Sequence, residues 1–250
     1  MPVTWSCDCR LEDWPVQSSP TTLRRTLVDQ PRSESELVAR ARELSGLTLA
    51  EAAASVHQKV PDDLMHHKGW TGQLLERILG ATAASRDVPD FEQLGIELKT
   101  LPVDERGRPV ESTFVCTLPL QEIAESEWDA SRVKRKLSRV LWMPVEGSRS
   151  IRLSERHLGE PMMWSPSEVE MATLKFDWDT LAGIVGRGDV ESITGHLGVA
   201  MQVRPKARNA SARRWAVDED GVRIAQMPRG FYLRAEFTHS ILKAHFRLSE

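Results

Sequence analysis

Apolar residues recur at helical intervals in the first third of the chain. Ser33 and Glu36 have capping-box spacing where the first such stretch begins, and Thr48 and Glu51 repeat that spacing before the second. A third helix is predicted over residues 72–79, where leucine and isoleucine side chains share one side. These stretches predict three amphipathic helices that cover a common core.

Strand-like patterns follow. Residues 97–119 hold two β-rich runs around the turn-rich residues 104–109, and the economical prediction is a hairpin. Further strands are predicted at 140–145, at 200–203 leading into Arg204-Pro205-Lys206, and at 231–233.

Helices are interleaved with these later strands. Residues 127–139 predict a basic helix, and Ser165-Pro166-Ser167-Glu168 predicts a capped start, with proline at the first helical position, for a long helix through Leu181. Thr238 is the predicted cap of a C-terminal helix. The fold class that follows is mixed α/β, with a mixed sheet flanked by helices.

Length and composition bound the organisation. The 250 residues, 28% charged and 40% hydrophobic, suffice for one large domain or two lobes of one. Residues 1–32 have no hydrophobic period and predict a poorly ordered extension before a domain spanning 33–250. Without a long apolar run or a secretory pattern, the sequence predicts a cytoplasmic protein with no membrane contact. The three cysteines, Cys7, Cys9 and Cys116, favour reduced thiols.

Charge is unevenly distributed. The net charge is -3, from 33 basic and 36 acidic residues, which argues against coating nucleic acid by bulk electrostatics. Basic residues nevertheless concentrate in 132–139 and 204–214, so a local cationic surface is possible. The alternative for each cluster is an ordinary solvated helix face or loop.

The candidate chemistry lies in residues 89–100, where Asp90 precedes a Glu97-x-Lys99 pair in an otherwise apolar stretch. Side chains two apart on a strand share a face, so Glu97 and Lys99 are expected to point the same way. Two carboxylates suit Mg²⁺, and a lysine can orient water or neutralise charge on phosphorus. The alternative is an exposed Glu–Lys pair on an edge strand, which needs no functional explanation.

Several separate stretches resemble one family. They are Lys68-Gly69-Trp70, Leu74-Leu75-Glu76, Asp90 to Lys99, Pro102-Val103-Asp104, Thr113-Phe114-Val115-Cys116, Lys136-Leu137, Arg139-Val140-Leu141-Trp142, Pro144-Val145-Glu146-Gly147, Trp164-Ser165-Pro166, Arg204-Pro205-Lys206-Ala207 and Arg229-Gly230-Phe231-Tyr232-Leu233. In this order they resemble the MutH DNA mismatch-repair endonucleases, from about Ser33 to the C-terminus. The residues before Ser33 depart from the family pattern.

The resemblance implies a restriction-endonuclease-like fold with two lobes around a cleft for double-stranded DNA. It implies Mg²⁺-dependent nicking of the unmethylated strand at hemimethylated GATC sites, stimulated by MutL after MutS has found a mismatch. The low net charge agrees with a protein that binds DNA weakly unaided and must be recruited.

The resemblance also implies residue roles. Asp90 and Glu97 would hold the metal, Lys99 would complete the catalytic set, and Glu76 would be an accessory acid. Two lysines would act near the scissile phosphate, and four residues would read DNA. The two lysines are Lys68 and Lys136; the four readers are Arg204, Pro205, Lys206 and Tyr232. Tyr232 and Pro205 are the candidate sensors of the adenine methyl group. The adjacent His66 and His67 receive no role.

The expected protein is a monomeric, partner-activated nickase of DNA mismatch repair. A restriction endonuclease that cuts both strands of GATC is an alternative within the enzyme class. A catalytically silent DNA-binding adaptor is the alternative outside it, although the complete Asp90, Glu97 and Lys99 set argues against an adaptor.

Overall fold

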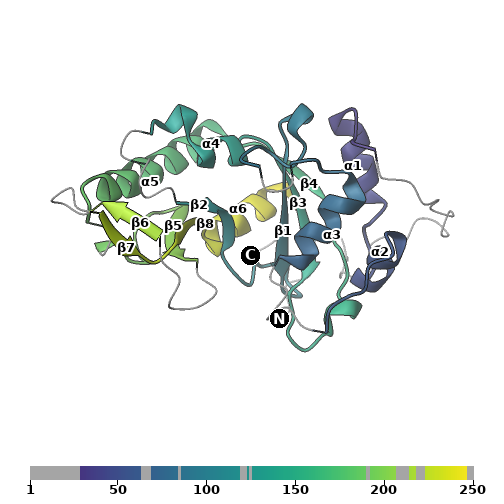
Figure 1. Ribbon diagram of the computed structural model, residues 1–250. Coiled ribbons are helices and arrows are strands. Elements are labelled where there is room, and N and C mark those ends of the chain that lie inside the picture. Colours follow the sequence, from purple (N-terminus) through teal and green to yellow (C-terminus); the bar gives the residue numbers. More distant parts are fainter. Residues whose placement is uncertain are drawn as a thin grey trace. The chain divides into compact units, whose positions relative to one another are not determined.

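A computed structural model describes residues 29–62, 69–83, 86–118, 123, 126–189, 192–206, 214–217 and 223–246 (Figure 1). The chain divides into two units. Unit 1 holds the described residues up to Val110, Arg139–Trp164 and the described residues from His239 onward; unit 2 holds those in Glu111–Ser138 and Ser165–Thr238. The mixed α/β class is confirmed for the chain, and the mixed sheet lies in unit 1. The predicted domain start at residue 33 stays a prediction, since residues 1–28 lie outside the described part.

Unit 1 is built on a mixed three-stranded sheet. Its strands are β1 (Glu97–Val103), β3 (Val140–Glu146) and β4 (Met162–Trp164), in the order β1-β3-β4. β1 runs parallel to β3, with Glu97 opposite Val140 and Lys99 opposite Trp142, whereas β4 runs antiparallel to β3. β3 is therefore the central strand, and its nearly continuous apolar sequence matches its burial.

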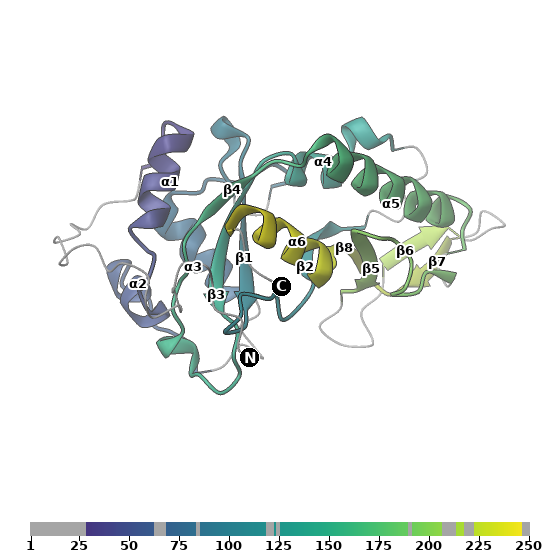
Figure 2. The same ribbon diagram turned by 180° about the vertical axis from the view of Figure 1, so that it is seen from behind.

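Three helices pack with this sheet, as Figures 1 and 2 show from opposite sides. They are α1 (Glu34–Arg42), α2 (Leu49–Ser55) and α3 (Trp70–Leu79). Ser33 caps α1, and Thr48 forms a reciprocal capping box with Glu51 at α2, which confirms both predicted starts. Each cap satisfies backbone N–H groups that a helix leaves without an internal partner.

The two faces of this sheet differ in chemistry. Leu98, Leu141 and Met143 are buried in one core with the leucines of α1, α2 and α3. Side chains alternate along a strand, so Glu97 and Lys99 lie on the face opposite this core. That second face is otherwise apolar, because Leu101, Val103 and Trp142 are buried on it, so Glu97 and Lys99 lie beside a second group of buried apolar side chains.

The predicted hairpin over 97–119 is wrong. The turn itself forms, because the Asp104 side chain accepts hydrogen bonds from the amides of Arg106 and Arg108, both at 2.9 Å. The returning chain makes only an isolated bridge, between Val103 and Pro109. β1 instead pairs with β3, and residues 113–117 join a sheet in unit 2. A turn signal is local, whereas strand partners depend on which buried strand is available.

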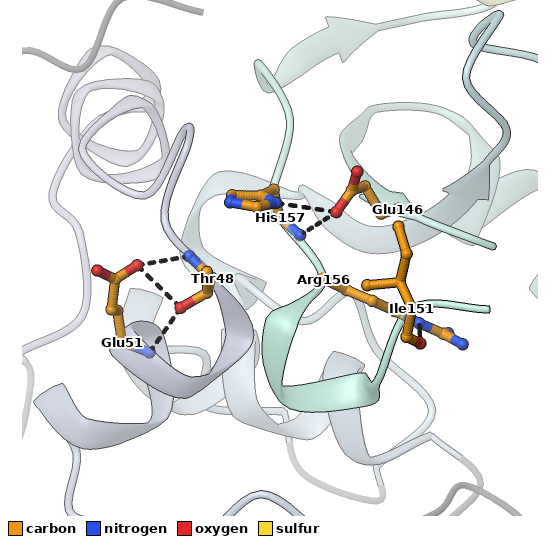
Figure 3. Close-up of polar contacts among 6 residues, drawn as sticks. All are labelled: Thr48, Glu51, Glu146, Ile151, Arg156 and His157. Atoms are coloured by element: carbon orange, nitrogen blue, oxygen red, sulfur yellow. Dashed lines mark hydrogen bonds and ion pairs between the residues drawn. The ribbon is translucent and has the colours of Figure 1, made fainter. Parts of the chain in front are cut away.

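The segment after β3 folds back onto α2 (Figure 3). Glu146, at the end of β3, accepts a hydrogen bond from the backbone N–H of His157 and contacts its Nδ1, both at 2.9 Å. His157 forms a bridge with Thr48, and Leu49 donates its N–H to the carbonyl of Arg156 at 2.8 Å. The short 3-10 helix Leu153–Glu155 is held between these contacts.

Unit 2 contains an antiparallel sheet in the order β2-β8-β5, formed by Thr113–Thr117, Arg229–Leu233 and Met201–Pro205. A second pair of strands, β6 (Arg214–Val217) and β7 (Arg223–Gln226), is antiparallel. The long helix α5 (Glu168–Gly186) packs against β5. The strands predicted near 200–203 and 231–233 are thus confirmed, and they turn out to be neighbours.

Helix boundaries in the second half differ from three expectations. The predicted basic helix is shorter, with the 3-10 turn Trp128–Ala130 followed by α4 (Arg132–Leu137). α5 is capped by Ser167 with Glu170, so Pro166 precedes the cap instead of opening the helix. Helix α6 (Ala235–Phe246) begins before Thr238, whose hydroxyl bonds backbone carbonyls from inside the helix. Ser165 with Glu168 and Ser167 with Glu170 have the same spacing, so the sequence alone does not show which serine caps α5.

None of the helices in the described ranges has the length and apolar character needed to cross a membrane.

Candidate active site and DNA-reading surface

A tight reversal brings Asp90 next to β1. Phe91 and Ile96 form an isolated bridge around the 3-10 helix Glu92–Leu94, and Gly95 closes the turn with a φ of 66°. That left-handed conformation favours glycine. The Asp90 carbonyl also accepts hydrogen bonds from the amides that follow α3, so its backbone is anchored on both sides.

The Asp90 carboxylate accepts a hydrogen bond from the edge of β1 that does not pair with β3. Oδ2 accepts the N–H of Leu98 at 2.9 Å, while the N–H of Glu97 points the other way and donates to the Arg139 carbonyl at 3.0 Å. Because β1 is an edge strand, the Leu98 amide lacks a strand partner and Asp90 supplies one. Asp90 is only 8% exposed, so this strand edge is largely shielded from water.

Glu97 and Lys99 form a shielded ion pair on β1. The Lys99 Nζ donates to Glu97 Oε1 at 2.6 Å, and the Lys99 and Glu97 side chains are 13% and 3% exposed. An exposed edge-strand pair is therefore wrong for these two residues, because their contact with water is small. Removing one partner from such a pair leaves a charge with poor solvation.

The donor set fits a hard divalent cation. Two largely buried carboxylates lie beside β1: Asp90 binds the N–H of Leu98, and Glu97 is the preceding residue of the strand. Mg²⁺ takes one or two carboxylates, and waters and phosphate oxygens complete its shell. In the part of the chain that the structure describes, no three His, Cys, Asp or Glu side chains gather into a protein-only metal cluster. Asp90 and Glu97 thus suit a metal that substrate and water help to hold.

Glu76 lies on α3, in the same unit as Asp90, Glu97 and Lys99. The leucines of the helix form its buried side, as predicted, while Glu76 is half-buried, and α3 packs against β1. Its role as an accessory acid stays a prediction.

Of the two lysines predicted to act near the scissile phosphate, only one lies in the described part of the chain. Lys136 is half-buried on α4 in unit 2. Lys68 lies outside the described residues, as do His66 and His67. The phosphate roles of both lysines therefore stay predictions.

Unit 2 brings together three of the four residues expected to read DNA, Arg204, Lys206 and Tyr232, whereas Pro205 follows Arg204 on β5 and alternates to the other face of the sheet. Gln202 is paired with Tyr232, and Tyr232 with Phe114, so these three side chains share a face, and Arg204 lies two residues along. The Phe114 and Tyr232 rings meet edge to face with centroids 5.3 Å apart. The opposite face carries Phe231 and Val203, both buried.

Cations lie over these rings. The Arg204 guanidinium carbon is 5.7 Å from the Tyr232 ring centroid, and Lys206 Nζ is 3.1 Å from the Phe114 centroid. Burial raises the pKa of the Tyr232 hydroxyl above its usual value, although the Arg204 charge opposes the shift. The phenol is therefore a neutral donor and acceptor at physiological pH. Aromatic faces beside exposed cations are suited to a nucleic acid with stacked bases and phosphates.

Phe114 was not predicted as a site residue, although it contacts both Tyr232 and Lys206. Its place on a β-branched strand was available as a signal, but its pairing with Tyr232 was not. Gly230 makes room for this ring, since a Cβ there would lie 2.8 Å from Phe114 Cε2. Arg204, Lys206 and Tyr232 are thus brought together as expected, with Phe114 added; Pro205 is exposed on the same strand.

A mixed α/β sheet with two acids and a lysine grouped at one edge strand is typical of nucleases of the restriction-endonuclease-like class. Residues 79–177 match the family model described as DNA mismatch repair enzyme MutH. The DNA mismatch repair protein MutH of Escherichia coli K12 is 49% identical over 222 residues, covering 89% of this chain and 97% of that protein. MutH of Salmonella newport is 50% identical over 222 residues, covering 89% and 96%.

The chain therefore belongs to the MutH family, and it is a DNA endonuclease of mismatch repair with a restriction-endonuclease-like fold. The matched segment 79–177 contains Asp90, Glu97, Lys99 and Lys136, whereas Arg204 and Tyr232 lie beyond it. Such nucleases are generally metal-dependent, which agrees with the donor set on β1.

Proposed function

We propose that this endonuclease uses Mg²⁺ to nick the unmethylated strand of hemimethylated GATC sites and that MutL stimulates it after MutS has located a mismatch. The observation that supports the chemistry best is the shielded set of Asp90, Glu97 and Lys99 on one strand edge. The observation that supports selective reading is the ring-and-cation surface around Tyr232.

Within this proposal Asp90 and Glu97 hold the metal. When bound, Mg²⁺ supplies Lewis-acid charge that stabilises negative charge on the scissile phosphate. Lys99 has three N–H donors, and its bond to Glu97 uses one, so the ammonium can also hold an attacking water or a phosphate oxygen. Burial of the pair keeps bulk water from competing for these bonds.

Other residues have supporting roles. Glu76 would act as an accessory acid, and Lys68 and Lys136 would contact phosphate near the cut. Arg204, Pro205 and Lys206 would bind DNA, with Tyr232 and Pro205 next to the adenine that carries or lacks a methyl group. Because the net charge is -3, binding unaided would be weak at physiological salt, which supports recruitment by a partner. The recruited protein is proposed to be a monomer.

The test is a nicking assay on one hemimethylated GATC duplex, with each strand labelled separately. The proposal expects cleavage of the unmethylated strand with Mg²⁺, accelerated by MutL and ATP, and none when the metal is chelated. Cleavage of both strands of an unmethylated duplex without MutL would favour a restriction endonuclease. Cleavage that ignores the GATC sequence would refute the specificity assignment.

A further inference from the structure

The segment from Gly195 to Ala200, which leads into β5 in unit 2, is held by a buried carboxylate. Asp177 on α5 is fully buried, and its two oxygens accept hydrogen bonds from three consecutive backbone amides. Val199 N lies 2.8 and 2.9 Å from the two oxygens, Ala200 N at 2.6 Å and Met201 N at 2.7 Å from Oδ2. A charge with this many donors is well compensated without water.

The carbonyls of the same segment are held by a cation. Arg234, immediately after β8, donates from Nε to the Gly198 carbonyl at 3.0 Å and from Nη2 to the carbonyls of Gly195 and Leu197 at 2.8 and 2.9 Å. Its backbone N–H donates to the Ala200 carbonyl at 2.8 Å. The carboxylate takes the amides and the guanidinium takes the carbonyls, so the segment's polar groups are fixed from both sides.

Glycine is required at the bend between the two. Gly198 has a φ of 86°, and a Cβ there would lie 2.0 Å from the Met201 carbonyl oxygen and 3.3 Å from the Asp177 carboxyl carbon. The chain therefore folds tightly around Asp177 before β5 begins.

Both charged groups act at the same rung of the sheet. Met201 is the first residue of β5 and pairs with Leu233, the last residue of β8. Asp177 binds the amide of Met201, and Arg234 directly follows Leu233. A slip of one residue along β5 would move Arg204 to the opposite face and expose Met201, since side-chain direction alternates along a strand.

We propose that Asp177 and Arg234 are positioning residues for DNA reading: they fix the register of β5 on β8, so that Arg204 lies beside Tyr232 on the reading face. Neither residue is assigned contact with DNA. The inference rests on the proposed function in one respect, namely that Arg204 and Tyr232 read the GATC site.

Two variants test it, Asp177→Asn and Arg234→Gln. The first places a side-chain amide N–H₂ against backbone amides, and the second removes the charge and the forked donors. Matched controls are Asp179→Asn, two residues along α5 in an exposed pair with Lys175, and the exposed Arg187→Gln at its end. Arg234→Lys keeps the charge without the fork and should give an intermediate result.

The first readout is hydrogen exchange of the segment 199–206 in the free protein. Both variants should raise its exchange rate by about tenfold or more while α5 stays protected, and the controls should match the unmodified protein. Unchanged exchange in this segment would show that Asp177 and Arg234, which we call the clamp, do not fix β5 on β8. If Asp177→Asn fails to fold, Arg234→Gln, which removes a half-buried group, decides the matter.

The second readout is the ratio of nicking rates on GATC and on a site with one base pair changed, at a temperature where every variant is folded. We expect the ratio to fall by about tenfold, chiefly through slower GATC nicking. A ratio equal to that of the unmodified protein, with only a lower melting temperature, would show that the clamp is merely structural. If the unmodified protein shows no GATC preference, the proposed function fails, while exchange still judges the clamp.

Discussion

The proposed catalytic segment of unit 1 and the proposed reading surface of unit 2 are built in opposite ways. Asp90, Glu97 and Lys99 are close neighbours in sequence, and their charged groups are shielded from water. Arg204, Tyr232 and Phe114 come from three strands that are distant in sequence, and the cations there are exposed. Bond cleavage benefits from few charges in a poorly hydrated place, whereas recognition needs contact area open to a duplex.

The difference explains how each region depends on the fold. A turn closed by Gly95 and one strand suffice to place the catalytic groups, so their geometry is mostly local. The reading surface forms only if three strands keep their register. Asp177 binds the first amide of β5, and Arg234 binds a carbonyl of the segment that leads into β5. Damage to the first should abolish cleavage, and damage to the second should blur selectivity.

The substitution with the largest expected effect on nicking is Asp90→Ala. We expect nicking to fall by about a thousandfold or more, because a metal-holding carboxylate is lost, while duplex binding is kept. Nicking under Mg²⁺ and binding by fluorescence anisotropy measure the two quantities. The exposed Glu92→Gln is the matched control. Retained nicking in Asp90→Ala would rule out the assigned site.

Lys99→Ala should combine a kinetic and a stability effect. Nicking is expected to fall about a hundredfold, and the free energy of unfolding by about 3 kcal/mol, since Glu97 keeps a shielded charge without its partner. Urea denaturation measures the second quantity.

Adding Glu97→Gln to Lys99→Ala should restore most of that stability but none of the activity. The unfolding free energies of the unmodified protein, the two single variants and the double variant form a double-mutant cycle. A coupling near zero would mean that the ion pair contributes nothing to the fold.

Tyr232→Ser should narrow the rate difference between hemimethylated and fully methylated GATC by about tenfold, because the ring that packs on Phe114 is lost. Tyr232→Phe is the control that keeps the ring without the hydroxyl. The measurement is the initial nicking rate on both duplexes. An unchanged ratio in the serine variant would show that Tyr232 only packs.

Arg204→Gln should change salt dependence rather than chemistry. Loss of one cation from the DNA-binding surface is expected to make the slope of log affinity against log salt less negative by about one. Binding isotherms at several salt concentrations give the slope, and the exposed Arg86→Gln in unit 1 is the control. If Arg204→Gln and the unmodified protein have equal slopes, Arg204 contributes no charge to DNA binding.

The smallest expected effect concerns pH. Burial lowers the pKa of His239 and His245 below the ordinary value of 6.5. Arg108 adds to the shift of His239, whereas at His245 the charge of Glu160 opposes the shift and Arg42 adds to it. As the pH falls, these histidines are protonated in the unfolded chain before they are protonated in the folded protein. The stability that they contribute is therefore fully present above pH 6.5 and is lost as the pH falls below it.

The measurement is the melting temperature between about pH 7.5 and 5.5, which spans the ordinary histidine pKa. Replacing both histidines with glutamine should flatten this dependence, while the exposed His196→Gln should leave it in place. A slope that survives the double replacement would assign the effect to other groups.

Local patterns predicted most elements of this fold. The side-chain cap at Ser33, the capping box at Thr48, the buried side of α3 and the apolar run of β3 all follow from neighbouring residues. The placement of Asp90, Glu97 and Lys99 around β1 was equally predictable, because the three are close in sequence. Strand partners were not predictable, and the expected hairpin failed for this reason.

By itself, the sequence determined the starts of α1 and α2, the strands β1, β2, β3, β5 and β8, and the grouping of Asp90, Glu97 and Lys99, because caps, turns and alternation act over a few residues. Tertiary structure alone decided that β1 lies parallel to β3, that Glu97 and Lys99 are shielded, and that Phe114 joins Tyr232. Burial and strand register depend on which distant segments pack together, and that packing has no signature within a short window of residues.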